Sequence, residues 1–182
     1  MKSKLTQTTV IALLIAVSLS LVGCGGDQAV EPSSKSSSST AILDKIWIES
    51  APEEVVAVAS ARQLSPGEPV AVAGVIGGVM HPFTEGFASF VVGDDAIVFC
   101  NEMGEDDHCS TPWDACCEDP ALLASRRALV QVLDADGMPL EVELRGQQGL
   151  KELSEVVVVG IVAAESTEDN LIINATGIHV KG

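Results

Sequence analysis

The chain has 182 residues, a formal net charge of −16 and 3% aromatic residues, with no tyrosine. This length fits one domain with extensions. The acidic excess repels phosphate backbones and anionic lipid head groups, and a nucleic-acid groove would need cations and aromatic stacking platforms. Nucleic-acid binding is therefore unfavourable, whereas solubility and attraction of a cationic or basic partner are favoured.

The N-terminus reads as an export signal. Lys2 and Lys4 precede Val10–Leu21, an apolar run of 12 residues that is too short to cross a membrane. The run leads into Leu21-Val22-Gly23-Cys24, which resembles a bacterial lipobox, where small residues precede a cysteine that becomes the lipidated N-terminus. The alternative is an ordinary signal peptide followed by an unrelated cysteine.

The lipobox resemblance implies that residues 1–23 are a lipoprotein signal peptide and that Cys24 carries the lipid. The mature domain would then be anchored in the bacterial cell envelope, in the periplasm or outside the cell. Gly25 stands where an aspartate would retain a lipoprotein on the inner membrane, so the resemblance favours the outer membrane. Loss of Lys2 and Lys4 would take the formal net charge from −16 to −18.

Residues 24–40 are rich in serine, so we expect a flexible tether there and a folded domain over residues 41–182. Ala41–Glu49 fits either a strand or a short helix. A helix is expected over Val55–Leu64, with Ser50 as its N-cap and Pro52 in the first turn.

Most of the remaining segments read as strands. Apolar alternation and β-branched runs predict strands over Pro69–Val79, Gly86–Asp94, Ala96–Phe99, Arg127–Leu133, Pro139–Leu144, Glu155–Ala164 and Leu171–Val180. Gly74 and Gly160 sit inside two of them and predict a bulge or a bend. Asp119-Pro120 predicts the start of a short helix, and Gln148–Leu153 fits one or two helical turns.

Two stretches resemble the OB-fold. GEPVAVAGVIGG (Gly67–Gly78) resembles its first strand, bent at a glycine, and VVVVGIVAAESTEDNLIINATGIHV (Val156–Val180) resembles its closing hairpin. The chain is also similar to uncharacterised bacterial OB-domain lipoproteins with a Cys…Cys-x-Thr-Pro-Trp-Asp-x-Cys-Cys segment, here Cys100 to Cys117. The resemblance implies an all-β fold with short helices, an OB-fold-like five-stranded Greek-key barrel with a cysteine-rich insert over residues 100–119. It implies no activity.

The insert holds four of the five cysteines, in the spacing C-x8-C-x6-C-C. Thr111, Pro112 and Asp114 predict a helix start before the last two cysteines, which would then point about 100° apart around the axis. Because exported proteins meet oxidising conditions and vicinal disulfides are strained, we expect two disulfides. Each would join Cys100 or Cys109 to Cys116 or Cys117, and the choice between the two pairings stays open.

Two other chemistries compete for these thiols. Cys109, Cys116 and Cys117, with His108 or His81, could bind a soft metal ion, although the spacing contains no C-x2-4-C knuckle. A redox role would use the cysteines at the predicted helix start, but no Cys-x-x-Cys is present and the acids nearby would raise the thiol pKa.

The remaining candidates are sparse. Trp113, His108 and Asp114 could form the rim of a ligand groove, and Trp113 fits better as a plug that needs a partner for its indole N–H. His179 lies on an expected strand, and no nucleophile motif is present, so we predict neither enzymatic activity nor a cofactor.

These observations favour a lipid-anchored, non-enzymatic binding or interaction module of the cell envelope. Its partners would be the membrane, through Cys24, and an unidentified protein or small ligand, for which the acidic charge favours a cationic one. The alternative is a thiol-dependent metal-binding or redox protein. Single-stranded nucleic-acid binding follows only from analogy with other OB-folds and is the least favoured.

Overall fold

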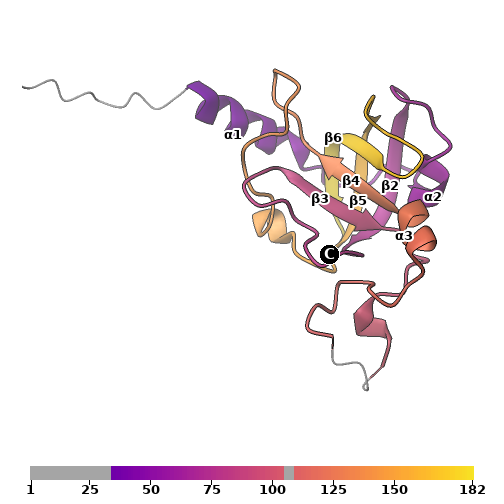
Figure 1. Ribbon diagram of the computed structural model, residues 1–182. Coiled ribbons are helices and arrows are strands. Elements are labelled where there is room, and N and C mark those ends of the chain that lie inside the picture. The colour runs from indigo at the N-terminus through magenta and orange to yellow at the C-terminus, as the bar shows by residue number, and fades with distance from the viewer. Residues whose placement is uncertain (1–33, 105–108) are drawn as a thin grey trace, which may run out of the picture. The chain divides into compact units, whose positions relative to one another are not determined.

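The computed structural model describes residues 34–104 and 109–182 (Figure 1). The predicted signal peptide, the first part of the predicted tether with Cys24, and His108 lie outside these residues. Within the described part of the chain, no helix is both long enough and apolar enough to cross a membrane.

Five strands close into a barrel. They follow one another around it as β2 (Pro69–Ile76), β3 (Ser89–Gly93), β4 (Arg127–Gln131), β6 (Leu171–Val180) and β5 (Glu155–Val162), and β5 pairs back onto β2. β4 and β6 run parallel, while the other neighbours are antiparallel. A sixth strand, β1 (Val56–Ala57), lies parallel to β2. The predicted OB-fold-like, five-stranded Greek-key barrel with short helices is confirmed.

Alternation along the strands fills the barrel as predicted. In β2, Val70, Val72 and Ile76 are buried, and in β3 Phe90 and Val92 are fully buried. β2 pairs with β5 along most of its length and with β3 only at Val75 and Ile76, so one strand serves both neighbours.

Of the two strand glycines, Gly160 marks a predicted irregularity, while Gly74 lies in a regular ladder with β5. A Cβ at Gly74 would stand 2.6 Å from the carbonyl oxygen of Gly93, so the close approach of β2 and β3 requires a glycine there. The register of β5 against β6 shifts between Val159 and Gly160, where a bulge was expected.

The N-terminal elements differ from the predictions. α1 (Ser34–Ile46) begins inside the serine-rich stretch assigned to the tether and resolves the ambiguous segment as a helix up to Ile46. Its apolar residues Ile42, Leu43 and Ile46 pack against the barrel core, which explains why a helix is held there. α2 (Val58–Ala61) is shorter than the predicted helix and is not capped by Ser50, because the two residues before it pair with β2 as β1.

Two predicted strands are absent. Ala96–Phe99 is a loop in which Ile97 donates to the carbonyl of Asp94 at 3.0 Å. Pro139–Leu144 forms no strand: Pro139 makes an isolated bridge to Leu133, and Leu140 donates to the carbonyl of Val132 and accepts from the amide of Ala88, both at 2.8 Å. Leu140 and Leu144 are buried as the alternation predicts. Both edges of β4 are already occupied, by β3 and β6, so no strand edge is left beside it for this segment.

Of the two short helices predicted in the second half of the chain, one is present and the other is reduced to a single turn. α3 (Pro120–Arg126) begins where expected, and the side chain of Asp119 accepts hydrogen bonds from the amides of Ala121 and Leu122 at 2.9 and 3.0 Å. The segment before β5 contains a single 3-10 turn, η2 (Gln147–Gly149), in place of one or two helical turns.

A second, smaller apolar cluster lies at the base of the insert. Its buried members are Ile97, Phe99, Ala115 and Leu123, separate from the main core of the barrel. Because Phe99 directly precedes Cys100 and Ala115 directly precedes Cys116, this cluster fixes the two ends of the cysteine-bearing segment.

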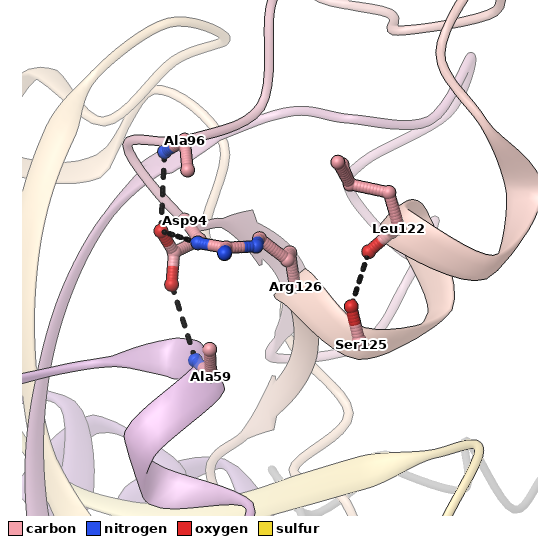
Figure 2. Close-up of polar contacts among 6 residues, drawn as sticks. All are labelled: Ala59, Asp94, Ala96, Leu122, Ser125 and Arg126. Carbon is pink, nitrogen blue, oxygen red and sulfur yellow. Dashed lines mark hydrogen bonds and ion pairs between the residues drawn. The ribbon is translucent and has the colours of Figure 1, made fainter.

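The buried carboxylate of Asp94 holds this region together (Figure 2). It accepts hydrogen bonds from the amides of Ala59 in α2 and Ala96, both at 3.1 Å, and pairs with Arg126 of α3 at 3.2 Å. Burial by itself would raise the pKa of Asp94. The two amide hydrogen bonds, a further hydrogen bond from the side chain of Asp95 and the charge of Arg126 outweigh burial and hold the pKa below its ordinary value.

Replacing Asp94 with asparagine should lower the free energy of unfolding by about 1–3 kcal/mol at neutral pH, because a charged acceptor is lost from a buried site. The pKa of Asp94 is lower in the folded chain than in the unfolded chain. The stabilisation contributed by the ionised Asp94 is therefore complete above about pH 4, and it disappears as the pH falls through the lowered pKa of Asp94 in the folded chain. Urea denaturation across this range measures it. A stability gap between the two proteins that stayed constant with pH would contradict the assignment.

Candidate functional site: the cysteine-rich insert

The insert leaves the barrel after β3 and returns through α3 to β4 (Figure 1). It opens with a 3-10 turn, η1 (Cys100–Glu102), and its two arms are joined by backbone hydrogen bonds. The amide of Cys100 donates to the carbonyl of Asp114 at 2.8 Å, and that of Asn101 donates to Pro112 at 2.9 Å. These bonds bring Cys100 close to Cys116 on the returning arm.

Trp113 fastens the insert to the barrel. Its carbonyl accepts a hydrogen bond from the amide of Gly78 at 2.8 Å, and its indole N–H donates to the carbonyl of Met80 at 3.0 Å. The side chain is half-buried. The indole N–H thus has the partner that a plug would require, and the role of Trp113 as a plug stays a prediction.

No helix begins at Thr111. The chain instead makes two turns, in which Asp114 donates to the carbonyl of Thr111 at 2.9 Å and Glu118 to that of Ala115 at 3.1 Å. The carbonyls of Pro112 and Asp114 accept from the other arm of the insert, so they are not used in a helical ladder. Asp114 is buried, and its carboxylate accepts a hydrogen bond from the amide of Ala115, so it does not stand at an open rim.

Three sulfurs converge in the insert. The Sγ atoms of Cys100, Cys109 and Cys116 all lie within 4.8 Å of one another. The distance from Cys100 to Cys116 is 3.7 Å, and Cys117 adds a fourth sulfur 4.0 Å from that of Cys116. Among the described cysteines no disulfide is formed, since a bond would need about 2.05 Å. The predicted clustering is present, and the pairings stay predictions.

The three thiols differ in acidity and in exposure. Burial raises the pKa of the Cys100 thiol, and hydrogen bonds with Cys100 and Cys117 raise the pKa of the exposed Cys116 to about 12. Hydrogen bonding to Thr111, whose Oγ1 lies 3.4 Å from the sulfur, lowers the pKa of the half-buried Cys109. Cys109 therefore ionises first and gives the cluster its first thiolate.

The cluster differs in membership from the metal set that the sequence left open as an alternative. Cys100 takes the place assigned to Cys117, because the bond from its amide to Asp114 draws it toward Cys116. His81 is exposed in the connection between β2 and β3. His179 lies on β6, with Nδ1 3.2 Å from the carbonyl oxygen of Ile48, in the strand-face role expected for it.

Comparison with protein-family models, with curated proteins and with solved structures finds no match to this chain.

Replacing Gly77 with alanine should detach the insert from the barrel. The added Cβ would stand 2.5 Å from the carbonyl oxygen of Trp113 and 2.9 Å from the ring of Phe99. We expect a loss of about 1–3 kcal/mol in the free energy of unfolding, measured by urea denaturation followed through tryptophan fluorescence.

Gly67→Ala is the matched control, because Gly67 has a φ of +90° but no atom within 4 Å of the added Cβ. It imposes backbone strain without a clash. Equal losses in the two variants would show that the contact with Trp113 does not hold the insert.

Proposed function

We propose that this protein is a non-enzymatic binding module of the bacterial cell envelope, anchored through Cys24, and that its insert binds a soft metal ion. The proposed ligands are the sulfurs of Cys100, Cys109 and Cys116. The observation that carries the proposal is the convergence of these sulfurs within 4.8 Å of one another. A single disulfide would use only two of them, whereas a metal ion uses all three.

The distances suit thiolate coordination. Thiolates are soft ligands that select Zn²⁺ or Cu⁺. A tetrahedral zinc ion with Zn–S bonds of about 2.3 Å holds its sulfurs about 3.8 Å apart. The 3.7 Å between Cys100 and Cys116 is close to that value. Cys109 would need a small approach, and a water molecule could complete the coordination.

The scaffold supports a preformed site. Cys100 is fixed by its amide bond to Asp114, and Cys116 belongs to the turn closed by the bond from Glu118 to Ala115. Both arms rest on the small apolar cluster that includes Phe99 and Ala115. Binding therefore requires little ordering of the first and third ligands, which lowers its entropic cost.

The predicted disulfides are the competing state of the same sulfurs. Cys100 and Cys116 are the nearest pair, and oxidation would release two protons and pass two electrons to a disulfide oxidant by thiol exchange. The envelope location favours such oxidation. Metal and disulfide exclude one another at these two cysteines, so one experiment can separate them.

The metal proposal predicts a distinct pattern among serine variants. Reduced protein should bind Zn²⁺ or Cu⁺ with one ion per chain, measured by elemental analysis after dialysis against a competing chelator. Cys109→Ser and Cys116→Ser should weaken binding by about tenfold or more, equivalent to about 1.4 kcal/mol. Cys100→Ser should weaken binding by a similar factor. Because Cys100 is buried, its replacement would also disturb packing, so Cys109→Ser and Cys116→Ser are the decisive variants.

Cys117→Ser is the matched control, since Cys117 is exposed and lies outside the converging three. It should keep most of the affinity. Absence of metal from reduced protein, or the lack of any thiol in the insert of protein unfolded directly from cells, would contradict metal binding. The second result would favour the disulfide pairs.

The anchor yields a separate prediction. The charged start, the apolar run and the small residues before Cys24 support export and lipidation. Cys24→Ala should shift the protein from the membrane fraction to the soluble or unprocessed fraction, measured by ultracentrifugation and mass spectrometry. Unchanged partitioning and an unmodified Cys24 in the original protein would defeat the lipoprotein assignment.

Nucleic-acid binding has less support. The OB-like barrel suggests it only by analogy, because many functions share one fold. The formal net charge of −16 repels a phosphate backbone.

A further inference from the structure

A groove lies between α1 and the connection from β4 to β5. Its volume is about 490 Å³, which falls within the usual range for ligand pockets. Leu43 of α1, Phe87 of the connection before β3, and Met138 contribute apolar surface to it. The groove shares no residue with the cysteine cluster, so its role is independent of metal binding.

The apolar lining is unusually open. Phe87 is 41% exposed and Met138 is 62% exposed, while most large apolar residues of the barrel are buried. Gathered apolar side chains at the surface indicate an interaction site better than scattered ones do. Here the two exposed side chains border the same groove, so a partner with an apolar group could cover both.

The charged lining has one sign. Asp134, Asp136 and Glu141 border the groove, and among the lining residues whose side chains the structure describes there is no lysine, arginine or histidine. The side chain of Asp134 accepts from the amides of Asp136 and Met138 at 2.9 and 3.0 Å, which fixes the loop. Asp136 and Glu141 are exposed, and the ion pairs found in the described part of the chain involve neither of them.

We propose that this groove binds a cationic segment of a protein partner, in which a lysine or arginine lies beside a large apolar side chain. The apolar side chain would rest on Phe87 and Met138, and the cation would lie between Asp136 and Glu141. A second copy of this chain is a poor occupant, because its formal charge of −16 would meet the same acidic surface. Charge complementarity thus selects a basic partner.

The test uses the full chain in nanodiscs of zwitterionic lipid and a short fluorescein-labelled peptide of alternating leucine and lysine. Fluorescence anisotropy gives the dissociation constant, with empty nanodiscs as the background. Asp136→Asn combined with Glu141→Gln should weaken binding by about fivefold, the size expected from losing one or two exposed ion pairs. Phe87→Ser combined with Met138→Ser should weaken it by a similar factor.

Glu53→Gln combined with Glu54→Gln is the matched control, because it removes the same charge from exposed residues that do not line the groove. It should change binding less than twofold, by about 0.4 kcal/mol or less. Equal weakening by the control pair would overturn the proposal in favour of non-specific attraction. It would also be overturned by equal binding of a leucine–glutamate peptide, by no binding of the original peptide, or by self-association that the Phe87/Met138 variant abolishes.

Discussion

The carboxylate of Asp94 lies where α2, the loop after β3 and the end of α3 meet, and it accepts or pairs with a group from each. A buried charge is tolerated only when such partners are present, so these three segments must come together for the chain to fold. That junction fixes the path of the chain into the insert. Ile97 and Phe99 then enter the small apolar cluster, and Cys100 follows in a defined place. The geometry of the thiols thus depends on a contact made outside the insert.

Much of the barrel could be predicted from local sequence. Alternation located β2 and β3, the valine run located β5, and Gly160 marked the bulge against β6. The predicted strands that do not form have a different cause. Pro139–Leu144 alternates as a strand does and buries the expected side chains. It reaches only residues beyond the ends of β3 and β4, through bonds of Leu140 with Val132 and Ala88, because β3 and β6 occupy both edges of β4. Whether a strand edge is free depends on how all strands of the sheet are arranged, so it cannot be predicted from a short stretch of sequence.

The candidate site was predictable as a group of residues but not as a geometry. Their close spacing identified the four cysteines of the insert, and the partner expected for the indole N–H of Trp113 is the carbonyl of Met80. The helix expected at Thr111 gave way to turns, because carbonyls that a helix would use accept instead from Cys100 and Asn101. These two residues are distant in sequence. The choice of Cys100 over Cys117 in the converging set follows from the same non-local bonds.

β3 and β4, the strands that precede and follow the insert in the chain, are neighbours in the barrel. Gly93, the last residue of β3, pairs directly with Arg127, the first of β4, so the chain leaves and re-enters the sheet at neighbouring positions. Loop length between such fixed ends costs little, because closure entropy grows only logarithmically. Of the intervening segment, residues 94–99 and α3 belong to the junction at Asp94, so the replaceable module is the insert itself, residues 100–119. Evolution could lengthen, shorten or exchange it while keeping the barrel, and a protein engineer could graft other thiol or peptide loops between Phe99 and Pro120.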